Sequence, residues 1–283
     1  MLSRESGSFG SGIVVTSAHL AKGLEFDQVV VPHVTATNYK THLDTRMLSR
    51  SLYPRYAQAC FEPHRQSFKI YFRIINCPLC SSTVLNKVDD EFFSCGTCHG
   101  LAKHPDLYPC KEAEESRYLE HNNEVNDPRY QRFTSPIHNF VKEHYSPTDV
   151  GLDFGSGTGP VITKVLRDDG FDIEAYDPFF APNKELFDRT YDYIAAYEVF
   201  EHFFNPKAEI AGLVKMVRTG GRLLVMTFRY DDSIDFKNWV YRKDISHVFI
   251  YRKETFQYIV ATYNLQLESV DKRLIVLRKT GSG

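Results

Sequence analysis

Long apolar runs are missing from this chain of 283 residues. A membrane-spanning helix needs about 20 consecutive apolar residues, and no stretch of the sequence comes near that length. The first residues also lack the apolar segment that a signal peptide carries. The sequence therefore predicts a cytoplasmic protein with no membrane partner.

Neither sign of charge dominates, because 34 Lys and Arg residues stand against 36 Asp and Glu residues. Residues 1–69 hold eight of the basic and five of the acidic residues, so the rest of the chain is acidic overall. Proteins that bind nucleic acids usually neutralise phosphates with Lys and Arg. A nucleic-acid partner is therefore possible but disfavoured, and the oligomeric state is not indicated.

Cysteine is scarce too, yet four of the six cysteines lie in two Cys-x-x-Cys pairs. Without a secretion signal, this spacing favours a metal site over a disulfide framework. Four thiolates on two β-turns can surround zinc tetrahedrally, and a site with four protein ligands is structural because no coordination position is open. An iron–sulfur site and four reduced, buried cysteines are the alternatives. The predicted zinc ligands are Cys77, Cys80, Cys95 and Cys98.

Four segments follow one another along the chain. Residues 1–69 contain one strong strand pattern and little further periodicity, and residues 70–110 carry the cysteine pairs on short β-type stretches, as in a zinc ribbon. Residues 111–148 form a polar helical bridge, in which residues 118–122 either fold over a pocket as a lid or form a solvated helix face. Residues 149–280 form an α/β domain.

The α/β domain alternates short apolar strands with amphipathic helices, which is typical of a mostly parallel sheet with helices on both faces. Only two residues separate the last two strands, so these must run antiparallel. The sequence thus predicts a doubly wound α/β fold that ends in an antiparallel hairpin. The expected strands are 150–154, 172–176, 192–197, 222–228, 265–270 and 273–278, and the expected helices are 158–169, 206–218 and 253–263.

A glycine-rich turn joins the first of these strands to the first helix. Glycine permits positive φ and a close approach to a ligand, and the helix N-terminus behind the turn offers free N–H groups. Asp177 ends the next strand, about 20 residues beyond the glycines, where it can accept two ribose hydroxyls. Asp153 precedes the first glycine, where it would repel a diphosphate but suits the ammonium and sulfonium groups of S-adenosylmethionine.

Four motifs resemble, in order, those of class I S-adenosylmethionine-dependent methyltransferases: residues 153–159, Asp177, residues 192–202 and residues 220–225. The resemblance implies a Rossmann-like sheet of the seven-stranded type and methyl transfer from this cofactor. Only 14 residues separate Asp177 from the third of these motifs, so the adenine-binding region must be compact and its contacts are not assigned. The implied cofactor-binding residues are Asp153, Gly155, Ser156, Gly157, Gly159, Asp177 and Glu198.

A Trp-x-Tyr-x-x-Asp-x-x-His pattern occupies residues 239–247, after the fifth strand of the family pattern. Loops at the carboxyl edge of a doubly wound sheet carry binding groups, and in the superfamily that this pattern resembles the histidine lies near the transferred methyl. His247 is the predicted general base, since a neutral imidazole accepts a proton near pH 7. Tyr241 is the second predicted catalytic residue. The alternative for His247 is a histidine that only bonds a neighbouring backbone group.

Residues 13–32 are of a different kind and closely resemble the fifth motif of superfamily 1 helicases of the helicase IV type. Residues 44–48 resemble the approach to the sixth motif, and a single-base frame change could relate residues 49–58 to the motif itself. The phosphate-binding Gly-Lys-Ser/Thr loop of such enzymes is missing. We therefore expect residues 1–69 to be a helicase-derived remnant, poorly ordered and non-functional.

A ribbon followed by a methyltransferase resembles two groupings, namely ribosomal RNA guanine methyltransferases and a broad set of bacterial small-molecule methyltransferases. The second is the closer resemblance, so the leading prediction is O- or C-methylation of a small-molecule acceptor. One alternative is an RNA methyltransferase whose ribbon holds the substrate, which the acidic domain disfavours. The other is a non-catalytic nucleic-acid-binding module, against which the intact glycine turn and its two aspartates count.

Overall fold

The computed structural model describes residues 75–120, 123–270 and 273–281. The predictions made for residues 1–69, including the resemblance to a helicase, lie outside these ranges. Contacts gather Ile74–Pro109 and Glu114–Gly283 into one compact unit, which contains the sites described below. No helix among the described residues is long and apolar enough to cross a membrane.

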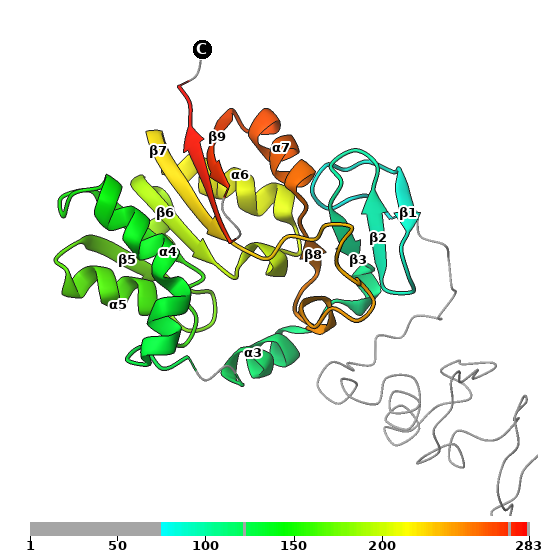
Figure 1. The fold of residues 1–283 in the computed structure, drawn as a ribbon, viewed down its shortest axis with the longest axis horizontal. Coiled ribbons are helices and arrows are strands. Elements are labelled where there is room, and N and C mark those ends of the chain that lie inside the picture. The colour runs from blue at the N-terminus through cyan, green and yellow to red at the C-terminus, as the bar shows by residue number, and fades with distance from the viewer. Residues whose placement is uncertain (1–74, 121–122, 271–272, 282–283) are drawn as a thin grey trace, which may run out of the picture. The chain divides into compact units, whose positions relative to one another are not determined.

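A six-stranded sheet forms the centre of this unit, in the order β5-β4-β6-β7-β10-β9 (Figure 1). The first four strands in this order run parallel, whereas β10 runs antiparallel to its neighbours β7 and β9. The predicted α/β fold with a terminal antiparallel hairpin is therefore confirmed. The strands are β4 (Val150–Phe154), β5 (Asp172–Tyr176), β6 (Tyr191–Tyr197), β7 (Val217–Met226), β9 (Leu265–Val270) and β10 (Leu274–Lys279).

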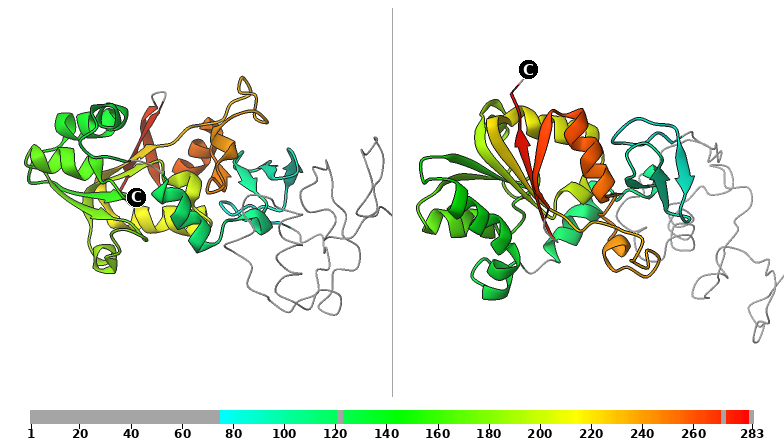
Figure 2. Two further views of the ribbon diagram at one scale, coloured as in Figure 1. Left: turned by 90° about the horizontal axis from the view of Figure 1, so that it is seen from below. Right: turned by 45° about the horizontal axis from the view of Figure 1, so that its top comes forward.

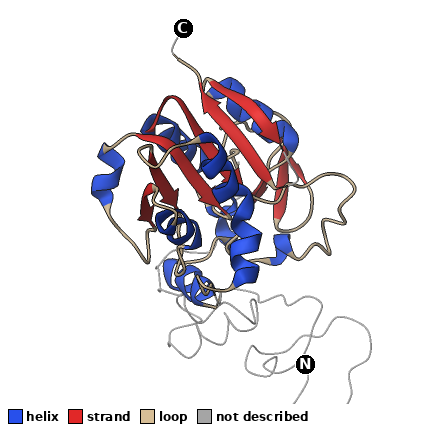
Figure 3. Ribbon diagram, turned by 60° about the vertical axis from the view of Figure 1, so that its left-hand side comes forward, coloured by secondary structure: helices blue, strands red, loops and turns tan. Residues whose placement is uncertain are grey.

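Helices cover both faces of this sheet (Figure 3). Consecutive residues of β7 show why: Leu224 packs into one apolar cluster, with residues of α4 and α5, and Leu223 packs into the other, with residues of α6 and α7. A strand that is apolar on both sides needs a helix layer on each. The helices are α4 (Pro128–His144), α5 (Val161–Asp168), α6 (Pro206–Met216) and α7 (Lys253–Thr262).

The family pattern implies seven strands, and the described residues form six in this sheet. The short stretch between β5 and β6 holds only the 3-10 helix η2 (Lys184–Asp188) and a bridge between Asp177 and Ala181. Two boundaries also differ from the predictions by three or more residues. The glycine turn continues through Pro160, so α5 begins at Val161, and β7 begins before its two glycines because its register against β6 shifts there.

The predicted bridge forms two helices, α3 (Lys111–Leu119) and α4. Asp127 accepts a hydrogen bond from the backbone N–H of Arg129 at 2.8 Å, and Pro128 occupies the first turn of α4. Proline fits there because that N–H would have no partner within the helix. The Asp-Pro pair therefore begins a helix.

The cysteine-rich segment forms three short antiparallel strands, β1 (Leu85–Lys87), β2 (Phe92–Cys95) and β3 (Leu101–Lys103). Their sheet is completed by β8 (Phe249–Ile250), which pairs antiparallel with β3. Figure 2 shows this ribbon, in cyan and teal, beside the orange segment of the chain that precedes α7. The ribbon thus shares a sheet with β8, which closely follows the Trp-x-Tyr-x-x-Asp-x-x-His segment at residues 239–247.

Candidate active site

The glycine turn lies at the carboxyl end of β4 and leads into α5. Gly155 and Gly157 have φ angles of 76° and 63°, a region that glycine adopts without strain. A Cβ atom on Gly155 would lie 2.4 Å from Val199 Cγ2, whereas nothing lies within 4 Å of a Cβ atom on Gly157. Ser156 is buried, and its Oγ has no hydrogen-bond partner among the described residues. The turn therefore offers open space and an unpaired hydroxyl.

Asp177 lies at the end of β5, beside this turn. One carboxylate oxygen accepts a hydrogen bond from Gly157 N at 2.9 Å, and the other accepts from Phe179 N at 2.8 Å and Phe180 N at 3.0 Å. A carboxylate has about four acceptor sites, so these three bonds leave room for a further donor. Asp177 thus holds the glycine turn to the loop after β5.

Asp153 is 3% exposed, and one of its oxygens accepts from Thr163 Oγ1 at 2.8 Å and Thr163 N at 3.2 Å. Burial raises the pKa of Asp153 to about 6, and the two bonds from Thr163 act in the opposite direction. At pH 7 the carboxylate is therefore mainly ionised and fastened to the first turns of α5. Its charge lies immediately in front of the glycines.

A cavity of about 750 Å³ extends between the glycine turn and the loop before β8. Cavities of this size are typical of small-molecule sites. Among the described residues, its wall contains one arginine, no lysine and six carboxyl groups. All the predicted cofactor and catalytic residues except Tyr241 belong to this wall, namely Asp153, Gly155, Ser156, Gly157, Gly159, Asp177, Glu198 and His247.

Glu198 follows β6 directly and has a φ of 49°, which is uncommon for a residue other than glycine. Its backbone N–H donates to Met226 O at 2.8 Å, which helps to hold this conformation. Burial, together with the nearby carboxylate of Glu201, raises the pKa of Glu198 to about 9. Glu198 is therefore protonated at pH 7, and its strained backbone is of the kind that often marks functional sites.

His247 is 7% exposed, and its Nδ1 lies 2.7 Å from Tyr241 O. A carbonyl only accepts hydrogen bonds, so Nδ1 carries the proton and Nε2 keeps a free lone pair. Burial lowers the pKa of His247 to about 4, so the ring is neutral at pH 7. The ring bonds a backbone group and also lies in the cavity wall, and its role as general base stays a prediction.

Tyr241, the other predicted catalytic residue, does not belong to the wall of this cavity. Its hydroxyl lies 2.9 Å from Thr227 Oγ1, and its ring centroid lies 4.2 Å from that of His247. Its carbonyl also holds the Nδ1 proton of that histidine. Tyr241 is therefore placed to position His247 rather than to touch a substrate.

The bridge supplies wall residues that the sequence did not identify as site residues. Tyr118 of α3 has its ring centroid 5.6 Å from that of Phe179 and 5.3 Å from that of His202. Arg117 pairs with Asp244 at 2.6 Å, a contact between distant parts of the chain that no local pattern could reveal. Tyr118 therefore borders the cavity, and the lid role of residues 118–122 stays a prediction.

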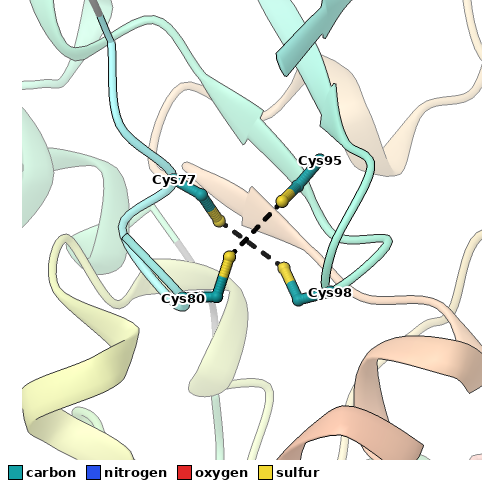
Figure 4. A group of neighbouring side chains, drawn as sticks. All are labelled: Cys77, Cys80, Cys95 and Cys98. Atoms are coloured by element: carbon teal, nitrogen blue, oxygen red, sulfur yellow. Dashed lines mark hydrogen bonds between the residues drawn. The ribbon is translucent and has the colours of Figure 1, made fainter. Parts of the chain in front are cut away.

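The cysteine side chains point toward one centre (Figure 4). The Sγ atoms of Cys77 and Cys98 are 3.5 Å apart, and those of Cys80 and Cys95 are 3.4 Å apart. All four cysteines are free thiols. A tetrahedral zinc ion with bonds of about 2.3 Å separates its sulfur ligands by about 3.8 Å, so a small adjustment would fit these thiols to zinc.

One lysine links the ribbon to the acceptor side of the site. Lys103 of β3 is 4% exposed, and its Nζ donates to the carbonyls of Asp244 and Ile245 at 3.1 Å each. Burial lowers the pKa of Lys103 to about 8. Together with the β3–β8 pairing, these bonds tie the ribbon to the segment that carries His247.

The described residues form an α/β fold with a cavity beside the glycine turn. A family model described as a methyltransferase domain matches residues 119–270, more than half of the chain. The chain belongs to this family of methyltransferases, as the sequence predicts. No match was found among curated proteins.

Several solved structures are similar to this chain. LaPhzM is 13% identical, with a TM-score of 0.41, and the match covers 59% of each chain. A 1,6-didemethyltoxoflavin-N1-methyltransferase from Burkholderia thailandensis is 12% identical over 70% of this chain and 99% of that chain, with a TM-score of 0.43. Magnesium protoporphyrin IX methyltransferase from Synechocystis PCC 6803 is 13% identical over 62% of this chain and 95% of that chain, with a TM-score of 0.41. The chain thus spans 59% of the length of the first structure and nearly all of the other two.

Proposed function

We propose that this enzyme methylates an oxygen or carbon atom of a small molecule, using the cavity to hold both the acceptor and S-adenosylmethionine. The observation that carries the proposal is the single cavity of about 750 Å³ whose wall includes both the glycine turn and His247. A methyl group can move directly only if sulfur, methyl and acceptor are aligned in one enclosed space. A shared cavity meets that requirement.

The cofactor side of the cavity is proposed to be the glycine turn with its two aspartates. Gly157 leaves open space, and Ser156 Oγ is a buried hydroxyl that lacks a partner among the described residues. Asp177 has a spare acceptor site for ribose hydroxyls. The carboxylate of Asp153 places negative charge near the end of the cofactor that bears the ammonium and sulfonium groups.

The acceptor side is proposed to be the region around His247 and Tyr118. Transfer breaks the bond between sulfur and methyl, and the electron pair stays on sulfur, so the enzyme chiefly needs to position the acceptor and exclude water. The aromatic ring of Tyr118 helps to enclose this end. The free Nε2 lone pair of His247 is suited to accept a proton from the acceptor.

The charge of the cavity wall disfavours the RNA alternative. One arginine faces six carboxyl groups there, whereas a polynucleotide needs cationic groups along its phosphates. The family assignment disfavours a purely non-catalytic nucleic-acid-binding role.

We further propose that the four cysteines hold a structural zinc ion. Their spacing, their convergence and the absence of disulfides among them support a tetrahedral thiolate site. Elemental analysis of the purified protein should find one zinc per chain, and the variant with Cys77→Ser and Cys98→Ser should lose it. Iron with visible charge-transfer absorption would instead support an iron–sulfur site.

Mass spectrometry of the ligands released from the purified protein tests the cofactor proposal. Release of S-adenosylmethionine or its demethylated product is expected. Calorimetric titration with S-adenosylhomocysteine should then give one site per chain. If neither cofactor form co-purifies and neither binds in titration, the proposed site is wrong.

A further inference from the structure

Three side chains meet where the end of β6 approaches the loop before β8. One nitrogen of His202, one nitrogen of His247 and one carboxylate oxygen of Glu201 all lie within 4.8 Å of one another. The two imidazole centroids are 4.8 Å apart. Both histidines belong to the cavity wall, so this cluster borders the space proposed for the acceptor. The four cysteines form a separate group.

The hydrogen bonds of the two histidines fix which ring nitrogens are free. His202 Nδ1 lies 3.0 Å from Ser246 O, and His247 Nδ1 lies 2.7 Å from Tyr241 O. Because each carbonyl can only accept, each Nδ1 carries a proton and each Nε2 has an unshared electron pair. Histidines that bind a metal through Nε2 are commonly held in this way by a backbone acceptor.

Glu201 adds a buried carboxylate, and only one of its two oxygens has a hydrogen-bond partner among the described residues. The residue has no solvent exposure, and its Oε2 accepts from Thr227 Oγ1 at 2.9 Å. Its Oε1 has no hydrogen-bond partner among the described residues. An unpaired buried carboxylate oxygen is costly, and a cation bound to it would remove that cost. The bond from Thr227 orients the carboxylate, as second ligand shells usually do.

We propose that Glu201, His202 and His247 form a binding site for one divalent transition-metal ion, such as Mn²⁺, Fe²⁺, Co²⁺ or Zn²⁺. Two imidazoles and one carboxylate are a donor set that suits these ions. Mg²⁺ and Ca²⁺ prefer oxygen ligands and are disfavoured. Three protein ligands leave coordination positions open, and the cavity beside the cluster gives an acceptor access to them.

A metal ion here would deepen the proposed function, and this consequence rests on that function. A hydroxyl oxygen of the acceptor would bind the ion. The ion lowers the pKa of that hydroxyl, so the hydroxyl proton would pass to water. The acceptor oxygen would then form a bond to the methyl carbon while the bond from that carbon to sulfur breaks. His247 would act as a ligand in place of a general base. Metal binding itself does not depend on methyl transfer.

Titration of the full chain with Mn²⁺, after zinc has filled the cysteine site, tests the proposal. Electron paramagnetic resonance should show one bound Mn²⁺ per chain, with hyperfine coupling to imidazole nitrogen. The variants His202→Gln and Glu201→Gln should each weaken Mn²⁺ binding at least about tenfold. The matched control is Glu209→Gln, which removes a carboxyl of the cavity wall that lies outside the proposed cluster and should leave Mn²⁺ affinity unchanged.

Titration of each variant with S-adenosylhomocysteine separates loss of the metal from loss of the fold. Retained binding of this cofactor product with lost Mn²⁺ binding supports the metal site. Absence of saturable Mn²⁺ binding to the wild type, or undiminished binding in both ligand variants, would overturn it. Failure of the cofactor to bind the wild type would instead contradict the proposed function and leave the Mn²⁺ result valid.

Discussion

At the scale of single residues, Asp177 is the residue on the proposed cofactor side whose carboxylate would accept the most hydrogen bonds. Its carboxylate already accepts three backbone hydrogen bonds, and ribose hydroxyls would add charge-assisted ones. Asp177→Ala should weaken S-adenosylhomocysteine binding by roughly a hundredfold, because hydrogen bonds to charged groups contribute about 1.5–3 kcal/mol each. Calorimetry measures the affinity, with Asp172→Ala at the exposed start of β5 as the control. Equal affinity in the two variants would rule out this role.

Asp153 makes the cofactor side sensitive to pH. Its folded-state pKa of about 6 lies above the ordinary value of 3.8, chiefly because of burial. Its contribution to stability in the cofactor-free protein is therefore fully present below about pH 4 and is lost as pH rises through 6. The affinity for S-adenosylmethionine should change with pH in the opposite direction, since its cationic end binds better once Asp153 is ionised. Affinity should rise between pH 5 and 7, and Asp153→Asn should remove this rise.

At the scale of elements, Lys103 of β3 ties the ribbon to the segment that carries His247. Lys103→Met should leave two buried carbonyls without their ammonium donor and lower the free energy of unfolding by about 1–3 kcal/mol. Thermal unfolding measures this loss. Lys87→Met, which removes an exposed lysine of β1, should have little effect. Affinity for S-adenosylhomocysteine should stay within a factor of two in both variants, because neither lysine belongs to the cavity wall. A Lys103→Met protein as stable as the Lys87→Met control would contradict the coupling.

The sequence predicted the strands of the central sheet better than it predicted which distant segments contact one another. The six strands of the central sheet lie within a few residues of the predicted ranges, because their apolar patterns are local. The cysteine spacing likewise indicated a cluster. The pairing of β3 with β8, the ion pair of Arg117 with Asp244 and the contact of Lys103 with Ile245 were not predictable. Each joins segments far apart in the chain, and a single sequence carries no pattern for such contacts.

Within the site, the positions of Glu201 and His202 were likewise not predictable from the sequence alone. They follow β6, and the structure places His202 in the cavity wall. The conformation of Glu198 at the end of β6 was equally hidden, since neither its positive φ nor its raised pKa follows from residue type. The pKa depends on burial, and the hydrogen bond from Glu198 N–H to Met226 O helps to hold the positive φ; the folded chain alone determines both.

At the scale of the whole molecule, the described residues of the cavity wall lie between positions 114 and 247. Because residues 1–69 resemble a helicase remnant that lacks a phosphate-binding loop, we predict that they are dispensable for cofactor binding. A chain that begins at residue 70 should bind S-adenosylhomocysteine within a factor of two of the full chain and should keep its zinc. Calorimetry and elemental analysis make this comparison. A tenfold loss of affinity would give the first segment a role.

The pairing of Leu101 with Ile250 also sets an order for folding. During synthesis the cysteine pairs emerge early, but β3 remains an unpaired edge until β8 has left the ribosome. Contacts between such distant segments form slowly, and exposed strand edges favour association with other chains. A metal ion bound early would keep the first three strands together during that interval. Chains synthesised under zinc limitation should therefore aggregate before they fold, even where the finished protein tolerates a chelator.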